Sequence, residues 1–497
     1  MKPQEPIKIL ELKGSDWLGG ISIQTTIPVG GNFQSATNFD PFETMGYLQP
    51  SLTPVKVDNS TIDTSVTSSV AVPGYVYVMG NRASAGAKFF YRINTSDQTV
   101  TDYKAEFLST ELLMSGLGYS NANGRIIYFS GTNGLLRSNT NPPVLANEVT
   151  IEGSPGINNQ PFLPKFVLGP DKIMYYTTGN ASIGKITNFI GTAGNNPTYL
   201  TPQSDLYTKD AVSDGTYLVV IADDNFAFSI PSTTATAQCR VFFMDVANTS
   251  KTTADVIWDI PDRYLIGCQF VEDTVLVFGY AGIWACSAGA SPRLVLPLTS
   301  DKLPSGPYQI TKSSNNIVSW SSVSSGRQTY SYGSLTGKKI LYNPFQPTQD
   351  GTQVNTMLTS SGPYFYAGVS DGASNSDLYV LNSGSTRGSS EVETANIVLS
   401  QPFSLSYVKV TLKDPLSTGQ GIDVSMYDSA GTTILASSPK EYSTVGAKKT
   451  FKFEPVNSGT MVRHFEDFTL LVNPRVGAVV ERVTVYGIPA TDASQLI

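Results

Sequence analysis

The sequence predicts an almost entirely β protein, with a β-propeller of six or seven blades followed by a C-terminal β-sandwich or jelly roll. Two observations predict it: charged residues make up only 15% of 497 positions, and seven short apolar runs recur at nearly even spacing. Their starts lie 51, 47, 44, 58, 42 and 47 positions apart. One apolar strand in each repeat of about 40–50 residues is typical of propeller blades. The runs are 75–79, 126–129, 173–176, 217–221, 275–278, 317–320 and 364–367.

Composition favours strands over helices. The charged fraction is below the usual quarter, while Gly (43 residues) and Tyr (25 residues) are abundant. Surface helices draw on Glu, Lys, Ala and Leu, and such residues are scarce at the positions where helices would need them. Strands joined by polar turns are therefore expected throughout.

Four regions follow one another along the chain. We expect an N-terminal arm at 1–70, the propeller at 71–385, a polar linker at 386–395 and the sandwich at 396–497. Propellers often close by adding an N-terminal strand to the last blade, and 21–27 is the candidate for that closure. Seven blades is the direct count; six remains an alternative if one apolar run is an outer strand.

Alternating segments supply the other strands. Within the blades, 89–93 and 240–245 alternate as second and third strands do, and turn residues follow each of them directly. Beyond the linker, six segments in about 100 residues have the pattern of a sandwich. They are 396–399, 406–412, 422–427, 450–453, 468–472 and 483–486.

Charge and cysteine content exclude several classes of function. The net charge is −7, and the sequence has no run of Lys and Arg of the kind that neutralises a phosphate backbone, so specific nucleic-acid binding is not expected. No stretch approaches the 18 apolar residues of a membrane span, and no apolar signal segment opens the chain. We expect a soluble protein, made in the cytoplasm, whose three cysteines are free thiols in or near a β core.

Catalytic motifs are nearly absent. The single histidine, His464, rules out His-clustered metal sites, and no Walker loop, nucleophile elbow or C-x-x-C occurs. Glycosidases need only two carboxylates, so Asp223–Asp224 and Asp371 with Asp377 are the remaining candidates, although solvated rim acids are the favoured interpretation. The loop 371–377 is a weak Ca²⁺ candidate, more simply a β-turn. We therefore assign no catalytic, cofactor-binding or metal residues and expect no cofactor.

At two segments the chain resembles the tail nozzle (tail tubular, DNA-stabilising) proteins of short-tailed phages. Residues 38–42 read Asn-Phe-Asp-Pro-Phe, and 46–52 read Gly-Tyr-Leu-Gln-Pro-Ser-Leu. The resemblance implies a homo-oligomeric ring, usually of six copies, that lies below the portal and contacts adaptor and fibre proteins. DNA would pass through such a ring without specific binding, and the protein would reside in the virion tail after synthesis in the host cytoplasm.

The leading hypothesis is thus a non-enzymatic structural component of a phage tail, most simply a nozzle that extends the DNA exit channel and helps to retain the genome. The alternative is a tail hub or a receptor- or carbohydrate-binding protein, with exposed rim aromatics such as Trp320 or Tyr332 stacking on sugars. A propeller glycosidase using Asp223 and Asp224 is less favoured.

Overall fold

The structure is a computed structural model of the 497-residue chain. It describes residues 5–17, 26–27, 33–40, 47–57, 66–81, 88–103, 105, 107, 114–130, 134–157, 164–225, 238–248, 253–297, 310–324, 327–336, 339–340, 343–345, 354–370, 376–381, 383–384, 386–436, 439–442, 448–455 and 465–490. Across these residues the chain is all β, apart from the short 3-10 turns η1 (Gly14–Trp17) and η3 (Leu145–Asn147).

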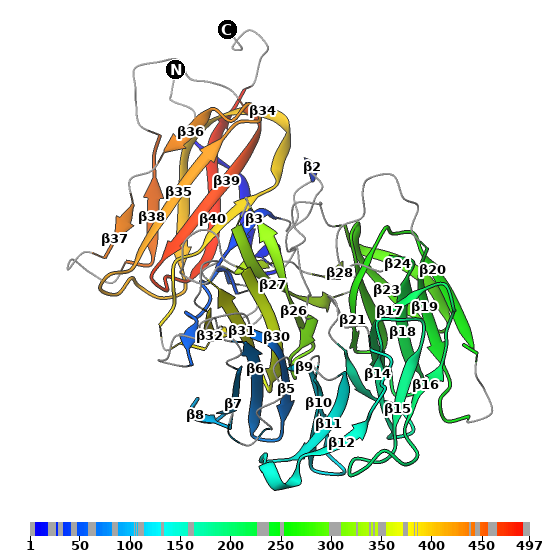
Figure 1. Ribbon diagram of the computed structural model, residues 1–497. Coiled ribbons are helices and arrows are strands. Elements are labelled where there is room, and N and C mark those ends of the chain that lie inside the picture. Colours follow the sequence, from blue (N-terminus) through cyan, green and yellow to red (C-terminus); the bar gives the residue numbers. More distant parts are fainter. Residues whose placement is uncertain are drawn as a thin grey trace.

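Seven sheets form the propeller (Figure 1). Blades 1 to 3 are β5 (Val66–Val72), β6 (Tyr75–Asn81), β7 (Lys88–Asn94) and β8 (Val100–Asp102); β9 (Met114–Ser120), β10 (Arg125–Ser130), β11 (Leu135–Thr140) and β12 (Val149–Glu152); and β13 (Phe166–Leu168), β14 (Met174–Thr177), β15 (Ile183–Ile186) and β16 (Asn196–Leu200). Blades 4 and 5 are β17 (Tyr207–Ser213), β18 (Leu218–Asp223), β19 (Cys239–Met244) and β20 (Val256–Ile260); and β21 (Leu265–Val271), β22 (Thr274–Gly279), β23 (Gly282–Ser287) and β24 (Ala290–Pro297). Blade 6 is β25 (Ile310–Lys312), β26 (Ile317–Ser324), β27 (Arg327–Thr336), β28 (Lys339–Ile340) and β29 (Asn343–Phe345), and blade 7 is β30 (Val354–Ser361), β31 (Tyr364–Ser370), β32 (Ser376–Leu381) and β4 (Val55–Lys56).

The blades close into a ring, because the first strand of each contacts the first strand of the next and β30 contacts β5. Every apolar run of the sequence lies on the second strand of a blade, so the prediction of a propeller is confirmed and its blade number is seven. These strands pack between two neighbouring blades. All six residues of β10 and all six of β18 are buried, which explains continuous apolar runs in place of alternation.

Closure uses a different segment from the one that the sequence suggested. The outer strand of blade 7 is β4 (Val55–Lys56), which pairs antiparallel with Tyr379 and Val380 of β32. The prediction of 21–27 as the closing strand is therefore wrong. Its described part, β2 (Thr26–Ile27), instead pairs in parallel with β34 of the second domain, and 21–25 lie outside the described residues.

The second domain is built from both ends of the chain. Its strands are β1 (Ile7–Lys13), β2, β3 (Phe33–Thr37), β33 (Glu391–Thr394), β34 (Asn396–Leu412), β35 (Gly421–Tyr427), β36 (Thr433–Ala436), β37 (Lys440–Glu441), β38 (Thr450–Phe453), β39 (Phe465–Arg475) and β40 (Val480–Pro489). The long strand β34 pairs with β39 near its start and with β40 over its second half. Strand β34 thereby joins β38, β40 and β1 on one side to β39, β33 and β35 on the other. The inward residues of both groups belong to one buried core.

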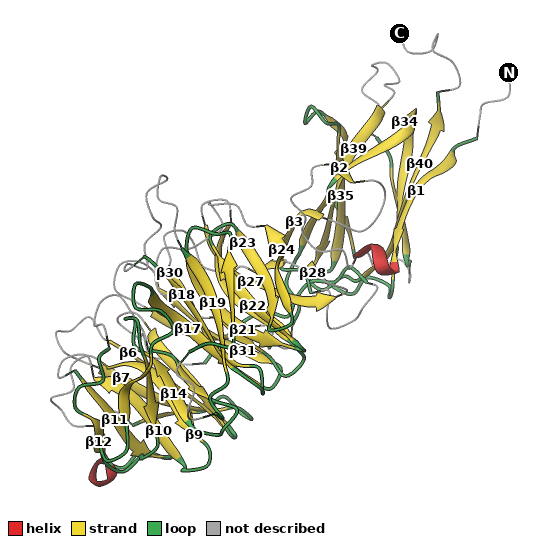
Figure 2. Cartoon of the chain, turned by 90° about the vertical axis from the view of Figure 1, so that its right-hand side faces the viewer, coloured by secondary structure: helices red, strands yellow, loops and turns green. Residues whose placement is uncertain are grey.

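This arrangement changes two of the expected boundaries. The segment 1–70 is not a separate arm, because β1 pairs with β40 and β3 pairs with β33. Likewise 386–395 is not only a linker, since it contains β33 (Glu391–Thr394), which pairs with β39. In Figure 2 the strands β1, β34 and β40 lie together, away from the propeller strands.

A short segment connects the two parts; we call residues 38–40 and 47–57 the joint segment. Leu48, fully buried, exchanges two backbone hydrogen bonds of 2.9 Å with Val480 of the second domain. A few residues later the same segment becomes β4 of blade 7. One stretch of chain therefore belongs to both domains.

The chain crosses between the domains a second time beside the joint segment. Thr53 N–H donates to the carbonyl oxygen of Thr386 (3.0 Å), and Gly384 N–H donates to that of Thr53 (2.8 Å). The Arg387 guanidinium donates to the carbonyl oxygen of Pro50 (2.8 Å). The two crossings are thus hydrogen-bonded to each other along their length.

Candidate functional site

The acidic residues singled out by the sequence occupy different environments. Asp223 is the last residue of β18 and is fully buried, whereas its neighbour Asp224 is exposed. Asp371 and His464 lie outside the described residues, as does most of the loop 371–377; Asp377 lies on β32. Of these candidates, only Asp223 and Asp224 have side chains in the described part of the structure.

A β-bulge brings Lys209 to Asp223. The pairing of β17 with β18 shifts between Thr208 and Asp210, so Lys209 is the extra residue. Its Nζ lies 3.2 Å from Asp223 Oδ1, and both side chains are about 1% exposed or less. The ammonium also donates to the backbone carbonyl oxygen of Asn225. The result is a buried ion pair at the end of blade 4.

Asp223 links this pair to blade 5. Its Oδ2 accepts the backbone N–H of Leu265 (2.9 Å), and its Oδ1 accepts that of Asn225 (2.9 Å). Burial raises the pKa of Asp223 to about 6, and the Lys209 charge opposes that shift. Burial lowers the pKa of Lys209, with Asp223 opposing. A carboxylate engaged in this way cannot reach a substrate without rearranging the rim.

Two more buried aspartates connect blades 4 and 5. Asp210 Oδ2 accepts the N–H of Cys268 on the first strand of blade 5 (2.9 Å). Asp262 Oδ2 accepts the indole N–H of Trp284 (2.9 Å), and a methyl group on Gly279 would lie 2.2 Å from that oxygen. Burial raises the pKa of both carboxyls. Asp210 and Asp223 therefore join blade 4 to blade 5, and Asp262 anchors the segment between these blades to blade 5.

The cysteines are free and buried, as the sequence predicted. Burial raises the pKa of all three thiols, that of Cys286 to about 12, so none is an activated nucleophile. Among the described residues no group of three or more His, Cys, Asp or Glu could hold a metal ion. Across the same residues, no helix has the length and apolar character required to traverse a membrane.

The prediction of Trp320 as an exposed sugar-stacking residue is wrong. Its side chain is 3% exposed, and its ring packs 5.4 Å from that of Phe278 between blades 5 and 6. The side chain of Tyr332 is not among those described. Of the propeller residues proposed for sugar binding or glycoside hydrolysis, Asp223 and Trp320 are thus buried and Asp224 is exposed. The side chains of Tyr332, Asp371 and Asp377 lie outside the described part of the structure.

The most distinctive exposed surface lies on the second domain. Strands β38, β34, β40 and β1 are neighbours in one sheet, and alternate residues face outward from it. Matched positions form three rows, while the rows between them, such as Phe453, Val408, Val485 and Leu10, are buried. We call the outward set the Lys–Tyr face: Lys8, Glu11, Lys13, Tyr407, Lys409, Thr411, Thr450, Lys452, Glu454, Arg482, Thr484 and Tyr486. Of these, Thr484 is only 3% exposed.

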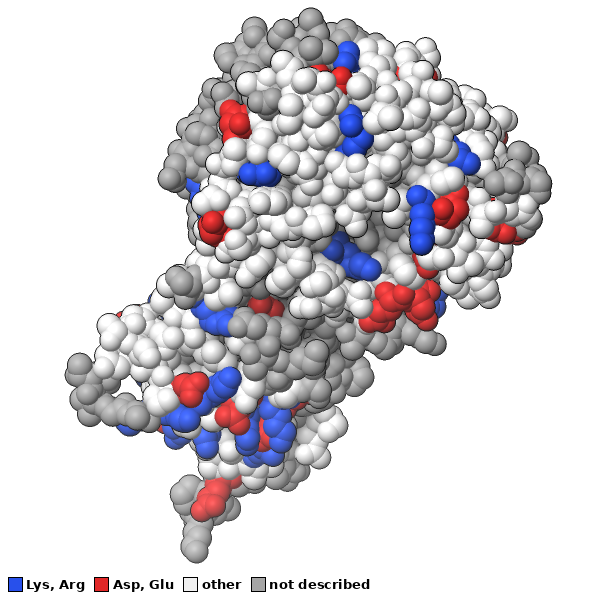
Figure 3. Space-filling model, turned by 90° about the horizontal axis from the view of Figure 1, so that it is seen from below, with Lys and Arg blue, Asp and Glu red and all other residues white. Residues whose placement is uncertain are grey.

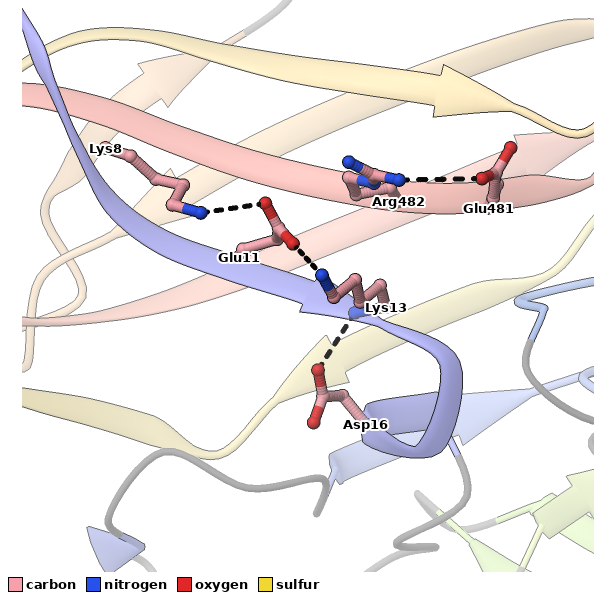
Figure 4. Close-up of polar contacts among 6 residues, drawn as sticks. All are labelled: Lys8, Glu11, Lys13, Asp16, Glu481 and Arg482. Atoms are coloured by element: carbon pink, nitrogen blue, oxygen red, sulfur yellow. Dashed lines mark hydrogen bonds and ion pairs between the residues drawn. The ribbon is translucent and has the colours of Figure 1, made fainter.

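Charges on the Lys–Tyr face are only partly paired. Glu11 lies between Lys8 (3.2 Å) and Lys13 (2.5 Å), as Figure 4 shows. Hydrogen bonds from these two ammonium groups lower the pKa of Glu11 to about 2. Arg482 on β40 lies 3.7 Å from Glu481, and Lys452 lies 2.9 Å from Glu454. Five basic side chains of the set meet two carboxylates within it and Glu481 beside it, which leaves a small excess of positive charge.

Two tyrosines occupy the centre of one row. The rings of Tyr407 and Tyr486 stack at 4.6 Å, and the Lys452 ammonium lies 4.0 Å above the Tyr407 ring. The sequence contains no cluster of Lys and Arg, yet the fold assembles one from strands hundreds of residues apart. The only sequence signal was the alternation of single lysines with buried residues at 8–13, 407–411 and 450–453.

Fold and site together define an all-β protein with a seven-bladed propeller, buried inter-blade charges and a charged face on a second β domain. No protein-family model matches the sequence, and no curated protein matches it. Solved structures with low similarity include a gluconolactonase of Xanthomonas campestris (10% identity; 67% of this chain and 99% of that one; TM-score 0.36). Others are a luciferin-regenerating enzyme (11%; 56% and 93%; 0.38) and prolyl oligopeptidase B of Galerina marginata (10%; 68% and 54%; 0.41). These neighbours are propeller enzymes, but at this similarity they carry no argument about activity.

Proposed function

We propose that this chain is a non-enzymatic structural component of a phage tail, of the nozzle type. Copies would form a ring that extends the DNA exit channel and helps to retain the genome. Adaptor and fibre proteins would be its neighbours, and its place would be the virion tail. DNA would pass through the ring without specific binding, which agrees with a net charge of −7.

The observation that carries this proposal is the place of the residues that resemble nozzle proteins. Those that the structure describes, 38–40 and 47–52, lie in the joint segment, where Phe39, Leu48 and Gln49 are buried and Leu48 is hydrogen-bonded to the second domain. Domains in one chain move relative to each other unless their interface is extensive. Here two chain crossings and a contiguous buried cluster span the boundary, as a part that transmits force between neighbours requires.

The buried charges of the propeller fit the same proposal. Lys209, Asp210, Asp223 and Asp262 are all engaged with neighbouring backbone or side-chain groups, so they contribute rigidity and are not free to act as an acid–base pair. A hub or receptor-binding protein of the tail would share this architecture, and is the alternative.

Particles purified on a density gradient test the proposal directly. This chain should be found by quantitative mass spectrometry in the particle band, at a fixed ratio to the portal subunits. Six copies for each portal ring would match a nozzle. Another fixed ratio would instead indicate a hub or fibre position, and absence from washed particles would refute a structural role. A panel of glycans, with hydrolysis assayed in wild type and Asp224→Asn, would reveal an enzyme if one exists.

A further inference from the structure

The Lys–Tyr face has more basic than acidic side chains, whereas the chain as a whole has more acidic ones. The whole chain has 33 basic and 40 acidic residues. On this face Lys8, Lys13, Lys409, Lys452 and Arg482 meet three carboxylates: Glu11 and Glu454 of the set, and Glu481, which pairs with Arg482. The side chains of Lys8, Lys13 and Lys452 are more than half exposed, and that of Arg482 is 41% exposed. In Figure 3 most of the broad surface is uncharged, and charged side chains gather on the smaller lobe. Such a local reversal of charge on an exposed sheet favours the approach of an anionic partner.

The face is also suited to docking by its shape. Its side chains stand on four hydrogen-bonded strands, so their spacing is set by the sheet. Tyr407 and Tyr486 stack within one row, and Lys452 reaches the Tyr407 ring from the neighbouring row. Because the two rings already stack on each other, no slot is open between them into which a nucleic-acid base could stack. Tyr and Arg are enriched at protein–protein interfaces, whereas Lys at the rim steers association.

An acidic surface with the opposite character lies on the propeller. Three turns emerge from the same edge of blades 4 and 5: β17–β18, β19–β20 and β21–β22. Their described residues include Asp214, Asp245, Asp255, Glu272 and Asp273 and no Lys or Arg. We call these five residues the acidic rim. The sequence adds Lys251 in the β19–β20 turn, outside the described residues, so the turns retain a clear negative excess.

The two surfaces lie on different parts of the molecule. In Figure 1 blades 4 and 5 are at the right, and the second domain is at the upper left. A contact between the Lys–Tyr face and the acidic rim would therefore join two copies of the chain. We propose that the Lys–Tyr face of one copy docks on the acidic rim of a second copy. This contact rests on the proposed function, for which it names the interface.

A contact between two different surfaces leaves both surfaces available on the outer copies. Such heterologous contacts propagate, and they close into a ring when the rotation between copies divides a full turn. Electrostatic complementarity of this kind mainly sets orientation, partner choice and association rate. The association should therefore weaken as salt rises, because exposed charges are screened within about 8 Å at physiological ionic strength.

Charge reversal tests the contact with the full-length chain. Lys409→Glu/Lys452→Glu makes the face acidic, and Glu272→Lys/Asp273→Lys makes the rim basic. By sedimentation velocity, each double variant should self-associate at least about tenfold more weakly than wild type, because like charges then meet. The variant with all four changes should regain association. An equimolar mixture of the two double variants should also regain it, since each supplies the surface that complements the other.

The control is Arg263→Glu/Arg293→Glu, which changes the net charge equally at exposed propeller positions; it should associate as wild type does. Circular dichroism establishes that each variant is folded. A wild-type chain that stays monomeric up to its solubility limit, or reversal variants that associate normally, would overturn the proposal. So would a monomer whose Lys–Tyr face binds a 30-nucleotide DNA probe, lost in Lys409→Glu/Lys452→Glu, since the face would then be a polyanion site.

The two proposals can fail separately. If the chain is present in particles but the reversal variants assemble normally, the nozzle proposal stands and this interface is wrong. If the chain is absent from particles but charge reversal abolishes self-association and the mixture restores it, the interface stands and the tail proposal is wrong.

Discussion

The propeller and the second domain are both all β, but they are assembled from the chain in opposite ways. In the described structure, each of blades 1 to 6 comes from one continuous stretch of sequence. Blade 7 includes β4, which precedes blade 1 in the sequence. The second domain pairs β1 with β40, at opposite ends of the chain. Local repeats are visible in a sequence because each unit repeats its own pattern, whereas pairings between distant segments leave no periodic signal.

Buried charge also differs between the two regions. In the propeller, Lys209 and Asp223 pair at nearly complete burial, whereas in the second domain Glu11 pairs with two largely exposed lysines. The first arrangement joins blades, and the second shapes an exposed face. The comparison teaches that Lys209 and Asp223 contribute to the packing of blades, whereas Glu11 and its lysines remain on a surface that a partner could reach.

Removal of the first 13 residues should have the largest effect. It deletes β1, whose Leu10 and Leu12 are 5% and 6% exposed, and each lost leucine costs about 2–5 kcal/mol. The second domain should therefore unfold while the propeller remains protected, as seen by hydrogen exchange and mass spectrometry. Deletion of residues 1–6, which precede β1, is the control and should leave protection unchanged. A protected second domain in the longer deletion would contradict the pairing of the two chain ends.

Loss of the buried carboxylate should come next. Asp223→Ala leaves the Lys209 charge without its partner and the Leu265 N–H without its acceptor, and breaking a buried pair costs about 3–5 kcal/mol. The propeller should lose this much in denaturant unfolding. Asp224→Ala, one residue later and exposed, should change stability by less than about 0.5 kcal/mol. Equal effects of the two substitutions would show that the pair has no structural role.

Acidification should act in opposite directions on the two regions. The pKa of Asp223 is raised to about 6, so between pH 6 and about 4 the folded propeller binds a proton that the unfolded chain does not, and stability rises as pH falls. The pKa of Glu11 is lowered to about 2, so its contribution is present above pH 4.5 and is lost below it. Thermal unfolding from pH 7 to 3 should show the first slope become shallower in Asp223→Asn, with the remainder due to Asp210 and Asp262, whose pKa burial also raises. The second slope should become shallower in Glu11→Gln. Unchanged slopes in these variants would assign the pH dependence to other groups.

The sequence predicted the propeller because each blade has a second strand buried on both sides, which requires a continuous apolar run such as 126–129 or 218–221. It also predicted most strands of the second domain, since alternation at 406–412 and 422–427 follows from one buried face. It did not predict the closing strand, because β4 has only two residues and both are exposed.

What the sequence by itself determined is therefore the class of fold, the repeat and the scarcity of catalytic groups. Only the tertiary structure decided the blade number, the contribution of β1 and β3 to the second domain, and the gathering of five basic side chains on one sheet. Tertiary structure also turned Asp223 from a candidate acid into a buried link and Trp320 from a candidate platform into core. The physical reason is that hydrophobic periodicity reports how each strand meets its immediate neighbours. Charges that meet across hundreds of residues are brought together by strand pairing alone, which no local pattern encodes.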